Sequence, residues 1–504
     1  MFSLRNYQER TVEAIRQQAM SGSKRILVAL ATGGGKTHTM AQLVLNALGK
    51  DNKVLALMHR RGLVEQMVER FSECGIDSGI IMAGKDPDLD RRCQVASLWT
   101  YRRRVMLEEN QFNRWFHEAP FLIIDEAHHV INKTYQKILE DYTDSFVVGF
   151  TATPIRSTGA GLGTYFDSLV NVVGMEELIN GGYLIPGVYY GPSEPDLSKL
   201  KIVQGDYEKK GLNEKMNKPQ IIGDVVDNWL KLASDKQTMV FSVNRKHGKA
   251  LCLEYQSRGI KAEYLDAHND DDERDGVLMR FRNGDTQVIC QVALYTEGTD
   301  IPEIECLVIA RPTKSLGLHR QILGRGARPY PGKESFIVLD HGGNIKRLGF
   351  YEDEISWTLD EKKGSNTADV PRVKEKTIID CPMCSTLFTG PKCPICGYKI
   401  KHYAKKIAAI EAELRPIGKN KKAEPTIEDK RRWVGMLEYH RRLKGFKHGW
   451  VAHKFNEKFK EFPDWSALKG WKMLEPDLTF NNYLKHLRIK WARSKSNPKN
   501  QATA

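Results

Sequence analysis

Short runs of apolar residues alternate with segments of helical periodicity from residue 25 onwards. A first set of five runs comprises 25–31, 53–59, 93–99, 121–125 and 146–151, with periodic segments such as 37–48 and 63–71 between several of them. After a polar stretch at about 191–219, a second set comprises 238–243, 262–265, 287–292, 306–310 and 335–339. Strands that alternate with helices favour parallel sheets covered on both faces. The pattern therefore predicts two tandem α/β domains.

The segments outside these two sets are polar, cysteine-rich or basic, and they predict the remaining boundaries. A polar stretch at about 352–376 precedes two Cys-x-x-Cys knuckles, and a basic stretch with helical periodicity follows them. We therefore expect a first α/β domain over 1–185, a linker over 186–220, a second α/β domain over 221–350, a linker over 351–376, a four-cysteine module over 377–400 and a basic helical module over 401–504.

The composition is typical of a soluble globular protein. Of the 504 residues, 41% are hydrophobic and 28% are charged, which excludes wholesale disorder. The longest apolar run, at 25–31, is much shorter than the roughly 18 residues that a membrane-spanning helix needs. The first residues contain no apolar signal core. We expect a cytoplasmic protein with no membrane partner.

The positive charge of the chain is confined to its last fifth. Residues 401–504 contain 25 Lys and Arg against 11 Asp and Glu, a balance of +14, which equals the balance of the whole chain. A solvated basic tail is one interpretation. The same segment contains five of the nine tryptophans, however, and disordered tails are poor in aromatic residues. This favours a folded basic module that binds polyanions.

Four of the nine cysteines lie within sixteen residues. They form two Cys-x-x-Cys knuckles, the spacing of a tetrahedral zinc site; two disulfides are the alternative, but an intracellular chain would rarely keep them. Because four thiolates leave no open position for water, we expect structural zinc here rather than catalytic zinc. The four predicted zinc ligands are Cys381, Cys384, Cys393 and Cys396.

A glycine-rich turn follows the first apolar run and opens a helical segment. In such a turn, backbone N–H groups can surround phosphate oxygens, and the helix N-terminus adds a favourable dipole. Lys36 can then reach the β- and γ-phosphates, and the Thr37 hydroxyl can bind Mg²⁺. A strict P-loop has glycine where this chain has Leu30. The glycines that remain are Gly33, Gly34 and Gly35.

Two acidic residues end another apolar run of the first set. Asp125 and Glu126 follow four apolar residues, so they are expected at the end of a buried strand rather than on a solvated face. There Asp125 can hold the Mg²⁺ shell while Glu126 orients and deprotonates the attacking water. Together with the glycine-rich turn, this pair predicts an ATPase that uses ATP and Mg²⁺.

With several further motifs in the expected order, these residues resemble the superfamily 2 helicases and translocases that carry the DEAH form of motif II. The resemblance covers roughly residues 1–345; its further motifs lie at 4–8, 59–60, 97–100, 151–154, 241–242, 296–300 and 321–328. With the cysteine knuckles and the basic tail, the chain is most similar to RadD-type bacterial helicases and related phage branch-migration helicases. The resemblance implies two tandem RecA-like parallel-sheet domains in a bacterial or phage-infected cell.

The resemblance also assigns roles to residues that match its motifs. The implied catalytic residues are Lys36, Glu126, Gln321, Arg325 and Arg328. The implied ATP contacts are Arg5, Gln8, Gly33, Gly34, Gly35, Lys36, Thr37, Asp125, Gly298 and Asp300. The implied nucleic-acid contacts are His59, Arg60, Thr100, Thr151 and Thr153. Arg325 and Arg328, on what reads as a helix start in the second domain, could stabilise charge on a γ-phosphate held by the first.

The basic module offers both apolar stripes and cationic side chains. Val451, Phe455, Phe459 and Phe462 recur at helical spacing, which is more typical of a helix core than of base stacking. We therefore place the nucleic-acid contacts on its cations, which would bind phosphates without reading sequence. These are Arg431, Arg432, Arg441, Arg442, Lys444, Lys447 and Lys454.

The sequence therefore predicts an ATP-dependent DNA helicase or translocase that acts on forked, branched or duplex DNA, with single strands as a further candidate. A single-strand-binding or recombination protein is a candidate partner. Two alternatives remain open: an RNA helicase, and a nucleic-acid-binding scaffold with an inactive motor.

Overall fold

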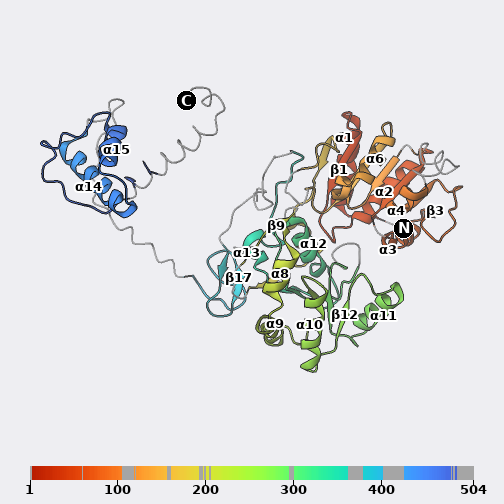
Figure 1. The fold of residues 1–504 in the computed structure, drawn as a ribbon. Helices are drawn as coiled ribbons and strands as arrows, with labels where there is room; N and C mark the ends of the chain where they lie inside the picture. The colour runs from red at the N-terminus through yellow and green to blue at the C-terminus, as the bar shows by residue number, and fades with distance from the viewer. Residues whose placement is uncertain are drawn as a thin grey trace. The chain divides into compact units, whose positions relative to one another are not determined.

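The computed structural model describes residues 3–59, 61–104, 119, 121–155, 161–191, 197, 200–203, 206–294, 300–360, 378–400, 425–477, 479–480 and 483–484. The chain divides into two compact units, residues 1–402 and 403–504. Figure 1 shows the first unit from red to cyan and the C-terminal helices in blue. Among the described residues, no helix is long and apolar enough to cross a membrane.

The first sheet has seven strands. They are β1 (Arg25–Ala29), β2 (Val54–Met58), β3 (Ser78–Ile81), β4 (Cys93–Ser97), β5 (Phe121–Ile124), β6 (Phe146–Thr151) and β7 (Ser168–Val170). Their order is β3-β4-β2-β5-β6-β1-β7, and every neighbouring pair is parallel. The helices of this domain are α1 (Asn6–Met20), α2 (Lys36–Leu48), α3 (Arg61–Glu73), α4 (Leu98–Arg104), the short η1 (Ala127–Ile131), α6 (Lys133–Asp141) and α7 (Met175–Asn180).

Both faces of this sheet are buried, as the uninterrupted apolar runs require. Along β1, Ile26 and Val28 belong to one apolar cluster, and Leu27 belongs to another. Side chains alternate between the two faces of a strand, so a strand that is covered on both faces is apolar at every position. Because the strands are parallel, the turn after β1 and the acids after β5 lie at the same carboxyl edge of the sheet. Open α/β sheets bind ligands at this edge.

The second sheet has eight strands, and the chain reaches it before the predicted second domain begins. Its strands are β8 (Gly187–Tyr190), β11 (Thr238–Phe241), β12 (Ala262–Leu265), β13 (Val288–Gln291), β14 (Cys306–Ile309), β15 (Phe336–Leu339), β16 (Ile379–Asp380) and β17 (Thr386–Phe388). The order is β12-β13-β11-β14-β15-β8-β17-β16. Pairing is parallel from β12 to β8 and antiparallel from β8 through β17 to β16. Two tandem parallel α/β sheets are thus confirmed.

The helices of the second domain follow its strands. They are α8 (Lys209–Met216), α9 (Pro219–Leu232), α10 (Arg245–Ser257), α11 (Asp271–Arg282), α12 (Leu316–Gly326) and α13 (Asn344–Leu348). A two-stranded hairpin, β9 (Ile202–Val203) with β10 (Asp206–Tyr207), precedes α8.

Three segments differ from the expected boundaries. The range 186–220, expected as a linker, contains β8, which pairs with β15 inside the second sheet. The range 351–376, also expected as a linker, begins with a described part, 351–360, that packs against the first domain through Leu359 and Asp360. The four-cysteine segment is joined to the second sheet, because β17 pairs with β8. Each of these contacts joins residues far apart in sequence, so local patterning could not indicate them.

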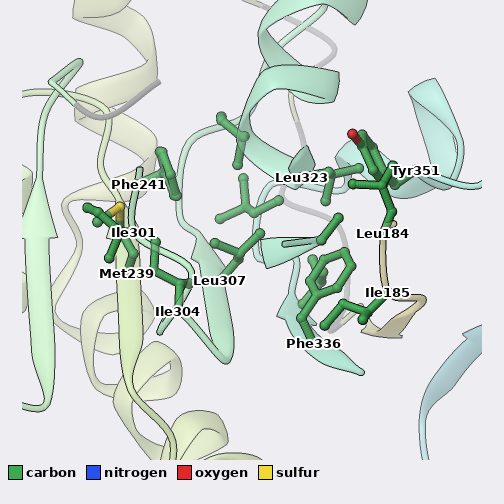
Figure 2. Close-up of a cluster of buried hydrophobic side chains, with 14 of the residues drawn as sticks. Leu184, Ile185, Met239, Phe241, Ile301, Ile304, Leu307, Leu323, Phe336 and Tyr351 are labelled. Carbon is green, nitrogen blue, oxygen red and sulfur yellow. The ribbon is translucent and has the colours of Figure 1, made fainter. Parts of the chain in front are cut away.

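One apolar cluster forms the core of the second sheet and continues into the first domain. Figure 2 shows Met239, Phe241 and Leu307 of its strands, with Leu323, Leu184 and Tyr351 gathered on one side. The same cluster includes Tyr7 and Leu30 of the first domain. The two domains therefore share buried apolar surface next to the glycine-rich turn.

The second unit contains a helical hairpin, α14 (Ile427–Lys444) and α15 (Gly449–Phe459). Thr426 caps α14 by accepting a hydrogen bond from the backbone N–H of Asp429 at 3.1 Å, and the Asp429 carboxylate accepts one from the Thr426 N–H at 3.0 Å. Val451 and Phe455 are buried as predicted, whereas Phe462 is 62% exposed. The reason is that Lys460 adopts a left-handed conformation and ends α15 before the stripe reaches Phe462.

Candidate active site between the two α/β domains

The turn between β1 and α2 has the shape of a phosphate-binding loop. Gly33 and Gly35 adopt φ values of +82° and +76°, which favour glycine. A Cβ on Gly33 would lie 2.9 Å from Leu184 Cδ2, and one on Gly35 would lie 2.3 Å from Gln8 Nε2. Both glycines are therefore needed for backbone conformation and for space. The turn delivers Lys36 to the first position of α2.

The first turn of α1 holds the glycine-rich turn from one side. Tyr7 donates its hydroxyl to the Gly34 carbonyl at 3.0 Å, and Gln8 Nε2 donates to the Gly35 carbonyl at 3.1 Å. Gln8 Oε1 accepts from the Arg5 N–H at 2.9 Å, so both ends of this 2%-exposed amide are engaged. In this structure Gln8 positions the turn, and its contact with adenine remains a prediction. The Arg5 guanidinium lies 4.4 Å from the centre of the Tyr183 ring.

The acidic pair lies where β5 ends, opposite the turn. Glu126 is 7% exposed and adopts a left-handed conformation with φ of 48°, and its Oε1 lies 3.3 Å from Lys36 Nζ. Burial raises the pKa of Asp125 to about 6, with the neighbouring Glu126 charge acting in the same direction and Lys36 opposing it. The structure thus brings Lys36, Asp125 and Glu126 together. Their roles in hydrolysis remain predictions.

One histidine connects the acidic pair to β6. His128 Nδ1 lies 3.4 Å from Glu126 Oε2 and 3.0 Å from the Thr151 hydroxyl. Thr151 in turn accepts from the Thr153 N–H at 3.1 Å, and both threonines are at most 1% exposed. In this arrangement the two threonines connect the acidic pair to the following segment, and their contact with nucleic acid remains a prediction.

The other residues of the first domain that were predicted to contact nucleic acid differ in burial and in the groups they contact. Thr100 is 6% exposed and accepts from the Ala83 N–H at 3.1 Å, which is a structural contact. His59 stacks on His129 with ring centres 4.1 Å apart. Arg60 and Gly298 lie outside the described residues.

The predicted arginine pair comes from the end of α12, not from a helix start. Ser315 caps this helix by accepting from the Leu318 N–H at 3.2 Å, so Gln321 lies about one and a half turns and Arg325 about two and a half turns into it. Gln321 and Arg325 are 5% and 3% exposed. Arg328 follows the helix; its Nη1 lies 2.7 Å from Asp300 Oδ1, and its Cγ lies 3.6 Å from the position of a Cβ on Gly33.

Helix α12 and the segment after α13 close directly onto the glycine-rich turn. A Cβ on Gly324 would lie 2.5 Å from the Thr32 Cβ, so the helix backbone reaches the turn itself. Tyr351, 1% exposed, donates its hydroxyl to the Thr32 carbonyl at 2.9 Å. Sequence reasoning missed Tyr351, because it belongs to no motif and lies in an expected linker. The structure therefore presents Arg328 and Lys36 to one turn from two different domains.

The four cysteines of the knuckles converge as predicted. Their sulfur atoms all lie within 4.8 Å of one another, and all four are free thiols. Zinc–sulfur bonds of about 2.3 Å in a tetrahedron imply sulfur–sulfur distances of about 3.8 Å. The Cys381–Cys396 and Cys384–Cys393 sulfurs are 3.4 and 3.7 Å apart. The donor set therefore fits a four-thiolate zinc site, and zinc itself remains a proposal.

Most predicted phosphate contacts of the basic module are paired within the module. Arg441 and Arg442 contact Glu438 at 2.6 and 3.0 Å. Arg432 contacts Asp477, Lys454 contacts Glu457 and Arg431 contacts Glu428. Lys444 and Lys447 have exposed side chains, and neither forms an ion pair with the described residues. They are the cations of this set most readily available to a polyanion.

Comparison with known families supports this geometry in two parts. Residues 1–156 match the family model "Type III restriction enzyme, res subunit". Residues 217–330 match "Helicase conserved C-terminal domain". The first match contains the glycine-rich turn and the acidic pair, and the second contains α12.

Similar proteins come from phages, fungi and archaea. A 51.5 kDa protein of a Lactococcus phage is 30% identical, over 77% of this chain and 81% of its own length. IRC3 of Saccharomyces cerevisiae, named as an ATP-dependent helicase, is 33% identical over 68% of this chain and 51% of its own length. The DNA 3'-5' translocase XPB2 of Sulfurisphaera tokodaii is 26% identical over 67% of this chain and 80% of its own length. This chain thus spans about half the length of IRC3.

A solved structure has the same fold. A fragment of an HsdR subunit of a type I restriction enzyme from Vibrio vulnificus matches 69% of this chain and 67% of its own, with a TM-score of 0.54 and 21% identity. The chain belongs to the superfamily 2 helicases that combine these two RecA-like domains. Its class is that of the ATP-dependent helicases and translocases.

Proposed function

We propose that this protein uses Mg-ATP hydrolysis to move along or unwind DNA, and that it acts on forked or branched DNA in recombination, repair or replication. The observation that carries the proposal is the convergence of Lys36, Glu126 and Arg328 on one glycine-rich turn from two domains. In superfamily 2 enzymes such a cleft converts nucleotide hydrolysis into relative domain movement.

In this proposal the first domain holds the nucleotide. Lys36 and the backbone N–H groups of Gly33 to Gly35 bind the phosphates, with Arg5 and Gln8 near the base. Thr37 and Asp125 would hold Mg²⁺, because a hydroxyl and a carboxylate are the oxygen ligands that this ion takes, and the ion would neutralise phosphate charge. Glu126 orients the attacking water and accepts its proton.

The second domain completes the site on closure. Arg328, held by Asp300 at 2.7 Å, and Arg325 supply positive charge to the γ-phosphate, with Gln321 on the same helix as Arg325. Once that phosphate is released, the attraction between the domains weakens. Alternating closure and opening would then move the two domains along a strand.

DNA is supported as the substrate by charge and by relatives. Residues 401–504 contain the entire net charge of +14. XPB2, a similar protein over two thirds of this chain, is named as a DNA translocase. We propose that the basic module grips phosphates, and that the four-cysteine segment holds structural zinc at the edge of the second sheet.

The test is steady-state ATPase activity with single-stranded DNA, duplex DNA, a fork, a four-way junction and RNA. We expect strong stimulation by branched or duplex DNA and little by RNA. Lys36→Ala should abolish turnover, whereas the matched control Lys24→Ala, at a 65%-exposed side chain, should not. Stimulation by RNA alone would make the protein an RNA helicase, and no turnover with any substrate would favour a scaffold with an inactive motor.

A further inference from the structure

The turn between α14 and α15 presents apolar side chains to solvent. Residues 442–449, here called the hairpin turn, are all exposed. Leu443 and Phe446 within it are 66% and 40% exposed. Neither residue joins the apolar core of this unit, which is formed by residues such as Val434, Leu437 and Phe455. The hairpin turn therefore leaves apolar surface that a ligand could contact.

The exposed phenylalanine belongs to a group of near-parallel rings. Trp450 stacks on Phe446 with ring centres 4.9 Å apart and planes 24° apart. Trp450 also stacks on His440 at 5.8 Å and 27°. Trp450 covers one face of Phe446 and His440 lies 6.3 Å from the Phe446 ring centre at 40°, yet 40% of Phe446 remains exposed. A flat aromatic ligand can extend the stack from there.

The backbone of the hairpin turn is fixed in place. Gly445 adopts φ of +69° and ends α14, and the Phe446 N–H donates to the Arg441 carbonyl at 3.0 Å. Arg441 Nη1 donates to the Phe446 carbonyl at 3.0 Å, while its Nη2 lies 2.6 Å from Glu438. Arg441, predicted as a phosphate contact, thus serves to hold Phe446. A ring that is held before binding loses little entropy on binding.

The surroundings of the exposed ring are positive. Residues 439–456 contain five Lys and Arg, three His and no Asp or Glu. Lys444 and Lys447 stand two residues before and one after Phe446, and neither forms an ion pair with the described residues. An apolar protein surface would gain little from these charges. A ligand with flat rings between negative charges, by contrast, matches both features.

We propose that the hairpin turn binds single-stranded nucleic acid by stacking an unpaired base on Phe446, with Lys444 and Lys447 neutralising the adjacent phosphates. Successive bases of a single strand are spaced by phosphates, so one stacked base places charge on both sides of the ring. The site selects unpaired strands rather than a sequence, because every base has an aromatic face. The inference rests on the proposed function only in taking nucleic acid as the partner.

The experiment compares two oligonucleotides of equal length, one of thymidines and one with the same backbone but abasic. Both carry a fluorescent label, and anisotropy is measured with the full chain and without ATP. The intact protein should prefer the thymidine strand. Phe446→Ala should weaken binding of that strand roughly 5- to 100-fold and leave abasic binding unchanged, since stacking contributes about 1–3 kcal/mol per base. Phe446→Trp should keep the preference.

The matched control is Phe462→Ala, which removes a 62%-exposed phenylalanine from the same unit and should leave both affinities unchanged. Equal loss of both strands in Phe446→Ala, or no loss in either, would overturn the proposal. In the second case an apolar protein partner becomes the better occupant. ATPase stimulation by duplex DNA is measured separately on the intact protein and on Phe446→Ala. Its absence in the intact protein would refute the proposed function. The preference for the thymidine strand would still be measurable, because the binding assay contains no ATP.

Discussion

The Lys36–Glu126 ion pair sets a cost for ATP binding that one substitution can remove. Their charged atoms lie 3.3 Å apart, and the side chains are 14% and 9% exposed. Lys36 must turn to the phosphates when ATP binds, so this contact competes with the nucleotide. At an effective dielectric constant of about 20, the attraction is at most about 5 kcal/mol, and a charged hydrogen bond contributes about 1.5–3 kcal/mol net.

Glu126→Gln keeps the shape of the side chain but removes its charge. We expect ATP to bind roughly 10- to 100-fold more tightly, as 1.5–3 kcal/mol implies. Turnover should fall by about two to four orders of magnitude, because the amide cannot accept a proton from water. Titration with a fluorescent ATP analogue measures the dissociation constant, and single-turnover hydrolysis measures the chemical step.

A double-mutant cycle isolates the contribution of Lys36. In the Lys36→Ala background, Glu126→Gln should tighten ATP binding much less, because there is no ammonium to release. Equal tightening in both backgrounds would mean that only the charge near the phosphates matters. Unchanged or weaker ATP binding in Glu126→Gln alone would refute the idea that this contact competes with nucleotide.

Four further predictions follow from the same structure. Tyr351→Phe leaves the Thr32 carbonyl without its donor, at a cost of about 1–3 kcal/mol, so kcat/KM for ATP should fall roughly tenfold in steady-state assays while nucleotide-free DNA affinity stays constant. Cys393→Ser should abolish zinc binding, measured by elemental analysis, and lower the Tm. Burial lowers the pKa of His247 to about 4, so below about pH 6.5 this residue takes up a proton when the protein unfolds. The free energy of unfolding, measured by urea titration, should therefore fall by about 3 kcal/mol between pH 6.5 and pH 4. The substitution His247→Asn should reduce this pH dependence. Deleting residues 401–504 should reduce the slope of log Kd against log salt for DNA; an unchanged slope would assign that module to a protein partner.

The local pattern of apolar residues was sufficient to predict the strands that are buried on both faces. Each of the five predicted runs of the first set contains one strand, because burial on both faces leaves an uninterrupted apolar run. Strand β8 was not predicted, because it is not buried on both faces. Its residues are mostly half-buried, and its partner β15 lies about 150 residues later. Such a strand has no local signal.

In the candidate site, too, residues with a local sequence signal were predicted and those that depend on three-dimensional packing were not. The residues expected at the glycine-rich turn and the acidic pair lie together, since each follows a strand of one parallel sheet. The helix start expected at Arg325 and Arg328 was wrong, because Ser315 caps α12 earlier in the chain, so that Arg325 lies near its end and Arg328 follows it. The pairing of Arg441 with Glu438 depends on side-chain geometry within α14. The number of positive charges in the segment predicts only that it attracts phosphate.

The antiparallel strand β17 has a consequence for solubility. Without it, β8 would end the second sheet with a row of unpaired backbone N–H and C=O groups, which is a template for association with other chains. With it, the sheet ends in β16, two residues long, whose Asp380 is paired with Lys346 at 2.8 Å. A short, charged terminal strand resists such association. The four-cysteine segment therefore covers what would otherwise be an open edge of the second sheet.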